Sequence, residues 1–546
     1  MSRNTTSHKS APRQTNKPAP QKARTSASPA KSKAGLRRLL RLPVLPVFFL
    51  LTWLWAAWYY GAVFHIAREY SFWTADTRVM DFILCQPWGG LRYVGRAILT
   101  LYQYNWLGGL VMALLLTAGS WLTGYCLRLR GAWRAAQYLP AVIFIAACTY
   151  HGLDLFFEAR TGFIFGIPFL CVLVLAACAL LLRCFSHKPL PSLLGMSPEE
   201  SPRQYWMQMV FIVLAFAAIV GFDQWQRPYV RVFCQMTTLQ YHQDWNGVQK
   251  VAREHAIMSN RPMACSYAIS LLQTQQIAER LYDIRLDYDS IHVTGMDGLL
   301  HNGVELYLPE GNYYAGFVES AMHSAMEQMV MTGPTIRLLK LQTKCALMRG
   351  EWELARKYLI LLRRVPFEGN FCDRYEPYIG QPAVVNADTE MALIRLTEPL
   401  HDCFEHWYKA PLFMGYNIGL TEGRSTNALI NSLSACLYTK LMPHFMERLQ
   451  PLAGTTPPSI IADGIVLAET KQPGIADYFS GTQLRISMIQ QFFKDVQPYM
   501  ADRPGNAYEL FPRFKGYYPY YYYFGNLKAT KQGYTGERNS SSGGVN

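Results

Sequence analysis

Charged side chains are scarce in this sequence, and acidic ones are nearly absent from its first part. Only 16% of the 546 residues are charged, against about 25% in a typical soluble domain. Residues 1–222 carry 22 Lys and Arg but 7 Asp and Glu, whereas residues 223–546 carry 30 and 31. This shortage indicates membrane-embedded chain. The neutral second half also argues against nucleic acid as a partner, because a nucleic-acid reader needs a basic face on its folded domain.

The sequence also lacks the short motifs that mark common enzymes. It contains no phosphate loop, Gly-x-Ser-x-Gly elbow, His-Glu-x-x-His pair or dinucleotide fingerprint. None of its twelve cysteines forms a Cys-x-x-Cys pair, which argues against structural zinc. The six cysteines of the second half allow disulfides if that half is exported: Cys234, Cys265, Cys345, Cys372, Cys403 and Cys436. We therefore assign no catalytic, cofactor-binding or metal-ligating residue, and whether the protein is an enzyme stays open.

The two ends of the chain have little that could be buried. Residues 1–41 contain eleven Lys or Arg and no acid, and Ser, Thr, Pro and Ala fill most of the rest. This composition is typical of disordered chain. We predict a basic cytoplasmic tail that contacts anionic lipid. Residues 527–546 are predicted to form a second, polar tail.

Long apolar runs are what the first half does contain. A helix needs about 20 apolar residues to cross the hydrocarbon core of a bilayer. Five runs are long enough: 42–67, 106–127, 135–157, 162–182 and 204–222. The first is too long and too aromatic for a signal peptide, and no A-x-A cleavage site follows it. The sequence therefore predicts a membrane domain of five spans over residues 42–222.

The positive charges predict how this domain is oriented. Arg128, Arg130 and Arg134 lie between the second and third runs, and Arg183, Lys188 and Arg203 lie between the fourth and fifth. Loops rich in Lys and Arg stay in the cytoplasm. With the N-terminus also inside, five spans place residues 223–546 outside the plasma membrane.

Residues 81–103 are half apolar and could form a sixth span. As a sixth span they would bury Arg92 and Arg96 in lipid, which is costly, and would move the Arg128–Arg134 loop outside. We predict instead an interfacial or re-entrant element with a turn at Gly89-Gly90.

The second half contains helical patterns that resemble tetratricopeptide repeats. In residues 333–366, apolar residues recur every three or four positions on both sides of Gly350, which predicts two antiparallel helices with Trp352 in the groove between them. Pro334 is expected at the first helical position. Residues 241–262 match less well, with Trp245 in the place of Trp352, 107 residues earlier and so about three repeats away. A helical bundle without repeats is the alternative.

The rest of the second half is also predicted to be helical. Residues 311–333 have an amphipathic helical pattern, and residues 425–450 and 459–500 are also predicted to be helices. The tyrosine-rich stretch 516–526 could bind sugar or peptide, but tyrosine clusters more often pack on a neighbouring element or at a bilayer surface. We favour packing, so the sequence predicts an all-α repeat domain over residues 223–526.

Two clusters of ionisable residues are candidate sites. His151, Asp154 and Glu158 share a helix face near the outer end of the third span, and Asp76 and Asp81 lie in the first outer loop. Together they could hold a metal or a lipid-phosphate sugar donor, although solvated groups beyond the end of the span explain them more simply.

The second cluster is the stretch "HDCFEHW". It brings His401, Cys403 and His406 together, but this spacing fits a zinc site poorly, so we interpret it as structural.

These features together resemble a bacterial polytopic membrane-protein family of unknown function with a tetratricopeptide-like C-terminal half. The resemblance rests on the basic tail, the five runs, "PWGGL" at 87–91, "DWNGV" and "GEWELARKYL". It implies an architecture and no activity. We therefore expect a membrane-anchored scaffold, with membrane lipid and a protein or peptide as partners. The alternative is a lipid-linked glycosyl- or phospho-transferase with an accessory repeat domain.

Overall fold

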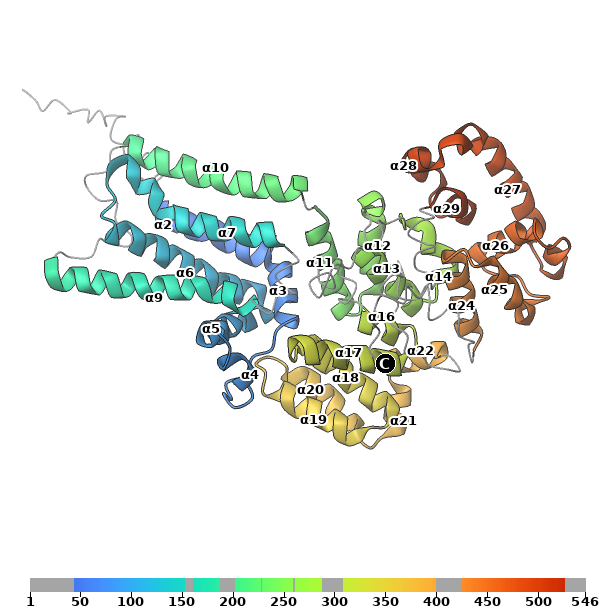
Figure 1. Ribbon diagram of the computed structural model, residues 1–546, viewed down its shortest axis with the longest axis horizontal. Helices are drawn as coiled ribbons and strands as arrows, with labels where there is room; N and C mark the ends of the chain where they lie inside the picture. Colours follow the sequence, from blue (N-terminus) through green and yellow to red (C-terminus); the bar gives the residue numbers. More distant parts are fainter. Residues whose placement is uncertain are drawn as a thin grey trace, which may run out of the picture. The chain divides into compact units, whose positions relative to one another are not determined.

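The computed structural model describes residues 44–152, 161–186, 202–226, 228–258, 261–286, 308–398 and 425–525. Every regular element in these ranges is a helix, so the predicted all-α class is confirmed for them (Figure 1). The first-half helices are α2 Val44–Leu54, α3 Gly61–Glu69, α4 Asp81–Leu84, α5 Gly89–Thr100, α6 Asn105–Cys126, α7 Leu139–His151, α9 Thr161–Ser186 and α10 Pro202–Gln226.

The prediction of five spans is wrong. Among the described residues, three helices are long and apolar enough to cross a membrane: α6, α9 and α10. A fourth span exists if α2, extended to Tyr59 by a π-helical turn, is counted with α3, although the two are bent by 57°. The described residues therefore contain three or four candidate spans. These helices still support a membrane protein.

Local breaks explain the difference. In the first run, Tyr60 leaves the helical conformation, and Gly61 starts a new helix against Asn105, where a Cβ would lie 3.2 Å from that side chain. In the third run, residues Gly131–Tyr138 form 3₁₀ turns and α7 has only 13 residues. Pro140 in its first turn and Gly152 at its C-cap, with φ of 54°, set these limits. Hydropathy measures the length of an apolar run but does not detect where a helix bends or ends.

Contacts along the bundle define its two ends. Cys126 Sγ contacts the Leu175 carbonyl at 3.4 Å, and Gly119 faces Val172, so α6 and α9 run in parallel. At the end where both finish, Gly131 faces Gln204 at the start of α10. The start of α2 lies at this same end, because the Phe48 and Tyr138 rings are 4.7 Å apart.

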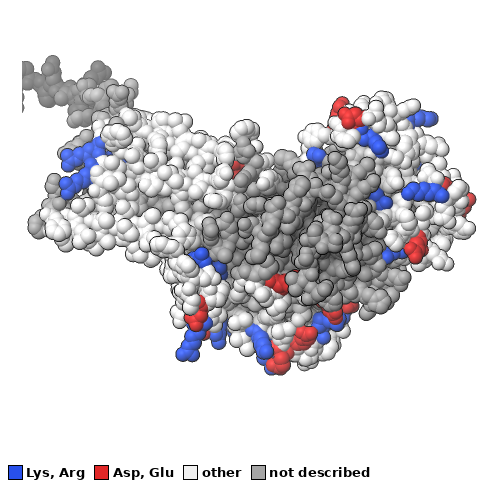
Figure 2. Space-filling view, viewed as in Figure 1, with Lys and Arg blue, Asp and Glu red and all other residues white. Residues whose placement is uncertain are grey.

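The opposite end of the bundle is where the chain leaves it. There, the Tyr59 hydroxyl donates to Asp223, near the end of α10, at 2.8 Å. The exposed Arg128, Arg130 and Arg183 therefore lie at the end where the chain enters α2. In Figure 2, Lys and Arg gather at the left end of the bundle, whose visible side is otherwise almost free of charge.

Residues 81–103 form α4 and α5, and the predicted turn lies just before Gly89, where Trp88 has a φ of 62°. Helix α5 has 12 residues, too few to span a bilayer. It packs closely on α9 through three glycines: a Cβ on Gly95 would lie 1.6 Å from the Gly162 carbonyl oxygen and 2.6 Å from the amide nitrogen of Gly166. Small residues at this spacing allow helix backbones to approach in membranes. The segment is therefore an integral part of the bundle.

The second half continues from α10 with a further series of helices (Figure 1). The helices up to residue 398 are α11 Pro228–Tyr241, α12 Trp245–Glu254, α13 Arg261–Gln273, α14 Ile277–Arg280, α16 Leu308–Tyr314, α17 Val318–Thr332, α18 Ile336–Arg349, α19 Trp352–Arg363, α20 Gly369–Tyr375, α21 Pro382–Ala387 and α22 Thr389–Thr397. Those after residue 424 are α24 Thr426–Tyr438, α25 Met442–Glu447, α26 Ser459–Glu469, α27 Thr482–Val496, α28 Arg503–Phe514 and α29 Tyr518–Phe524.

Five pairs of these helices are joined by the same turn. The pairs are α11/α12, α13/α14, α16/α17, α18/α19 and α24/α25. In each, a residue with positive φ precedes the second helix by two positions: Gln243, Gln275, Gly316, Gly350 and Lys440. The next amide then donates to the carbonyl five residues earlier, as Glu351 does to Ala346 at 2.8 Å. This bond satisfies a carbonyl at the end of the first helix.

The pair α18/α19 matches the prediction for residues 333–366 with one change. Gly350 ends α18 with a φ of 77°, and Leu338, Leu341, Cys345 and Met348 are buried, as expected. Helix α18 begins at Ile336, however, because the Thr335 hydroxyl accepts from the Leu338 amide at 3.3 Å and caps it. Pro334 therefore precedes the helix.

The tyrosine-rich stretch packs on neighbouring helices, as favoured. The Tyr518 hydroxyl donates to the Leu437 carbonyl at 3.1 Å, and the Tyr521 hydroxyl donates to the Tyr438 carbonyl at 2.8 Å. Both side chains are buried. The described cysteines of the second half are buried free thiols: Cys234, Cys265, Cys345, Cys372 and Cys436.

Candidate functional site

The acidic residues singled out in the sequence do not form one site in the described chain. Asp76 forms an ion pair with Arg364 at 2.8 Å, and Asp81 is the first residue of α4. His151 ends α7, whereas Asp154 and Glu158 lie outside the described residues, as do His401, Cys403 and His406. Within the ranges that the structure describes, no three His, Cys, Asp or Glu residues are grouped as a metal site would need.

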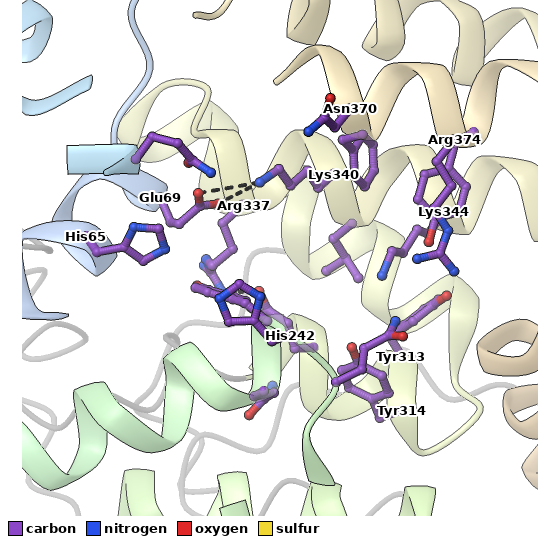
Figure 3. Close-up of a pocket in the computed structure, with 18 residues that line it drawn as sticks. His65, Glu69, His242, Tyr313, Tyr314, Arg337, Lys340, Lys344, Asn370 and Arg374 are labelled. Atoms are coloured by element: carbon purple, nitrogen blue, oxygen red, sulfur yellow. Dashed lines mark hydrogen bonds and ion pairs between the residues drawn. The ribbon is translucent and has the colours of Figure 1, made fainter. Parts of the chain in front are cut away.

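A charged cavity lies instead where α3 meets the second half (Figure 3). Its volume is about 440 Å³, within the usual range for small-molecule sites. Its lining comes from α3 and the turn after α5, from the end of α11, and from α16, α18 and α20. Its polar lining includes Glu69, Gln240, Tyr241, Tyr313, Arg337, Lys340, Lys344 and Arg374.

Helix α18 supplies three of the four cations. Arg337, Lys340 and Lys344 lie at i, i+3 and i+7 and therefore on one face. Figure 3 shows all three along this helix, with Arg374 from α20 beside Lys344. Several cations on one wall of a cavity create a positive potential that attracts anions.

Each of these cations is paired with a carboxylate. Lys340 Nζ lies 3.1 Å from Glu69 and 2.9 Å from Glu368. Lys344 Nζ lies 2.8 Å from Glu390, and Arg337 pairs with Glu310. Arg374 lies 3.2 Å from Asp388. A buried charge without a partner is strongly destabilising, and pairing with a carboxylate offsets this cost.

Exposure decides which charges a ligand would meet. The side chains of Lys340, Lys344 and Arg374 are 25%, 15% and 48% exposed, whereas their carboxylate partners are 4–5% exposed. The Arg337–Glu310 pair is the exception, with exposures of 4% and 12%. For three of the four cations, therefore, the cation is more exposed than the carboxylates with which it pairs.

The side chains of Lys344 and Arg337 stay protonated at neutral pH. Burial is the largest single effect on each and by itself lowers the pKa. For Lys344, Glu390 together with Tyr375 and Tyr314 outweighs burial and raises the pKa above its ordinary value. For Arg337, Glu310 together with Tyr70 and Tyr241 does the same. Both side chains therefore act as fixed positive charges.

Aromatic rings and unpaired polar atoms complete the cavity. Lys344 Nζ lies 5.9 Å from the centre of the Tyr313 ring and 5.8 Å from that of Tyr375. Within the described chain, the hydroxyls of Tyr241 and Tyr313 and the Gln240 side-chain oxygen are buried without a hydrogen-bond partner. Such groups cost free energy unless a water or ligand satisfies them. They are therefore available to a polar ligand.

The charged cavity could not be predicted from the sequence. Residues 333–366 gave only a helical pattern, and a basic stripe on a helix is usually solvated. The difference between the two helices comes from the structure: α18 is buried almost all round, whereas α19 exposes Glu353, Arg356, Lys357 and Ile360. Cations on a helix buried in this way have to be paired or to face a cavity.

No curated protein and no solved structure shows a match to this chain. A family model does match, over residues 169–525. That range contains every lining residue of the charged cavity except His65, Glu69 and Gln103. Because the match covers well over half of the sequence, the chain belongs to the family of unknown function DUF6057.

Proposed function

We propose that the chain is a membrane-anchored binding protein whose charged cavity takes an anionic group such as a phosphate. One observation carries the proposal: Lys340, Lys344 and Arg374 line the cavity, and their side chains are more exposed than the carboxylates with which they pair. An anion entering the cavity would meet ammonium and guanidinium groups first. Hydrogen bonds to such charged donors are the strong ones in proteins.

The free donors of these groups fit a phosphate. An ammonium has three donors and a guanidinium five. Within the described residues, the Lys344 ammonium group donates to Glu390, and Arg374 donates one of its guanidinium N–H groups to Asp388. The hydroxyls of Tyr241 and Tyr313 could supply neutral donors deeper in the cavity.

We also propose that residues 223–525 lie outside the plasma membrane. This orientation follows from the two ends of the bundle and not from the number of spans. The exposed Arg128, Arg130 and Arg183 lie at the end of the bundle where the chain enters, and the chain leaves α10 at the other end. Since basic loops stay in the cytoplasm, the second half then faces outward.

A protein-interaction scaffold is part of the same proposal. The recurrence of one turn in five helix pairs supports a repeat-like array. The first four turns are 32, 41 and 34 residues apart, close to the period of about 34 residues in tetratricopeptide repeats. Such arrays present extended surfaces to proteins or peptides.

Transfer from a lipid-linked donor is the second candidate. Glu69 and Glu310, together with His65 and His242, bring potential acid–base groups to the charged cavity. Both carboxylates are paired with cations, however, so this candidate has less support than binding.

Calorimetry on the full-length protein in phosphatidylcholine nanodiscs would test anion binding, with inorganic phosphate as the probe. Lys340→Gln removes one cavity cation, while Arg68 still pairs with Glu69 and Glu368. The expected effect is about tenfold weaker binding, from the loss of one charged hydrogen bond. The matched control is Lys357→Gln, an exposed change on α19 outside the cavity, which should leave the affinity unchanged. Absence of phosphate binding, or an equal loss in both variants, would contradict the proposal.

A further inference from the structure

A second cavity adjoins the charged one on the side of the membrane helices. We call it the tryptophan groove; its volume is about 510 Å³, and it is lined by Trp53, Leu54, Ala57, Trp58, His65, Gln103, Tyr104, Asn105, Trp106, Thr238 and His242. Three of these residues, His65, Gln103 and His242, also line the charged cavity. The two spaces therefore meet at these side chains.

The walls of the tryptophan groove belong to helices suited to a bilayer. Trp53 and Trp58 come from the first bent pair, and Trp106 lies at the start of α6. The Trp53 indole donates to the Trp106 carbonyl at 3.1 Å, which ties the two helices together. Trp58 and Trp106 are 83% and 57% exposed, as suits aromatic residues at a membrane surface.

The junction between the two spaces is polar. His65 Nδ1 lies 2.9 Å from the Tyr102 carbonyl oxygen and so donates to it, which leaves Nε2 of the neutral ring as an acceptor. The Gln103 side-chain oxygen is buried and has no partner within the described residues. Passing from the tryptophan groove to the charged cavity, a ligand would thus meet apolar rings, then amide and imidazole groups, then cations.

This order of surfaces matches the order of groups in an anionic lipid. We infer that the ligand is an amphiphile with a phosphate head group in the charged cavity and an apolar chain in the tryptophan groove. The inference rests on the proposed function, because it assumes that the charged cavity holds the anion. A lipid is favoured over a peptide because one space is lined by paired cations and the other by membrane-side tryptophans, and these are the surfaces that a phosphate head group and an apolar chain need.

The energetics favour such a two-part ligand. Each methylene transferred from water into an apolar site improves affinity about fourfold. A chain that places four methylenes in the tryptophan groove should therefore bind at least about 100-fold more tightly than the head group alone. The charged cavity would select the head group, and the tryptophan groove would supply most of the affinity.

A series of alkyl phosphates tests the inference with the full-length protein in phosphatidylcholine nanodiscs. Inorganic phosphate, n-butyl phosphate and n-octyl phosphate are titrated calorimetrically, with empty nanodiscs as the blank for partition into lipid. Thr238→Trp fills the tryptophan groove from α11 without changing a charged residue. Gln235→Trp is the matched control, since Gln235 is exposed on the same helix and lines neither space.

The expected result is an affinity that rises with chain length by at least about 100-fold over the series in the unchanged protein and in Gln235→Trp. Thr238→Trp should abolish the rise and leave inorganic phosphate binding as it was. If phosphate binds but octyl phosphate binds no better, the chain site is wrong and the anion-binding proposal stands. A rise that survives Thr238→Trp also overturns the chain site. If neither phosphate nor any alkyl phosphate binds, both proposals fail.

Discussion

Arg68 and Glu368 form a buried ion pair between two residues that lie 300 positions apart in the chain. Arg68 lies in the last turn of α3, at the membrane bundle, and Glu368 lies between α19 and α20. Arg68 also bonds to Glu69, and Lys340 contacts both carboxylates. Two cations and two carboxylates thus join the halves of the protein, and two of the four, Glu69 and Lys340, line the charged cavity.

Removal of Arg68 should therefore destabilise the protein as a whole. Arg68→Met leaves Glu69 and Glu368 with Lys340 as their one shared cation, and loss of a partner from a buried network costs about 3–5 kcal/mol. The free energy of unfolding of the detergent-solubilised protein would show this loss. Arg356→Met, which breaks the exposed pair with Glu353, should have almost no effect. Equal effects in the two variants would mean that the buried network does not hold the halves together.

The close contact between α5 and α9 should tolerate no side chain. Gly95→Ala would place a methyl group 1.6 Å from the Gly162 carbonyl oxygen, so the helices would have to separate. We expect low yield and an aggregated elution profile in size-exclusion chromatography. Gly90→Ala, on the same helix but with no atom within 4 Å of its Cβ, should elute as the unchanged protein does. A well-behaved Gly95→Ala variant would show that this packing is wrong.

The sequence predicted much of the helical architecture because helices leave periodic patterns. The apolar faces of α18 and α19 and the cap at Gly350 could be read directly from residues 336–363. The number of membrane spans was predicted wrongly, because it was taken from the length of the apolar runs. Hydropathy does not register a bend at Tyr60 or short turns before Leu139, because these depend on packing against other helices.

The charged cavity could not be found in the same way. The ion pairs between its cations on α18 and Glu69, Glu310 and Glu390 join residues up to 271 positions apart, and no local pattern links them. Asp76 and Asp81 were candidates because they lie in the predicted first outer loop, yet Asp76 pairs with Arg364 at the surface. Scarcity of charge identified the membrane half, but only the fold shows which charges meet.

The shared turn favours glycine at two equivalent positions, so introducing glycine at one and removing it from the other should change stability in opposite directions. Gln275 has a φ of 56° and an exposed side chain, so Gln275→Gly should remove strain and stabilise the protein by up to about 1 kcal/mol. Gly350 has a φ of 77°, so Gly350→Ala should destabilise it by about 1–2 kcal/mol. Chemical denaturation would measure both. Changes of the same sign would argue against the equivalence of the two turns.

Asp463 should make stability depend on pH. Burial raises the pKa of Asp463 to about 7, although Arg485 lies 3.2 Å away and opposes the shift. Its pKa in the unfolded chain is about 3.9, so the folded state holds the proton more tightly. This stabilising contribution is complete below about pH 4 and is lost as pH rises through about 7.

Asp463→Asn should remove this dependence. The melting temperature of the variant, compared with that of the unchanged protein, should rise between pH 5 and about pH 8, because the variant has no charge to bury. Asp477→Asn changes an exposed carboxylate nearby and should leave the difference constant across the same range. A constant difference for Asp463→Asn would show that this carboxylate is not held in its neutral form.

The orientation of the second half can be tested with an impermeant thiol reagent on intact cells, after any outer membrane is opened. The four exposed cysteines, Cys85, Cys171, Cys178 and Cys184, are first replaced, together with Cys403. Lys357→Cys then reports on α19, and Arg130→Cys reports on the basic end of the bundle; both positions are exposed. We expect labelling of Lys357→Cys in intact cells and labelling of Arg130→Cys only after the plasma membrane is permeabilised. We expect this because the basic end of the bundle lies opposite the end where α10 finishes, and loops rich in Lys and Arg stay in the cytoplasm. The reverse pattern would place the charged cavity on the cytoplasmic side, and its ligand would then have to come from the inner leaflet.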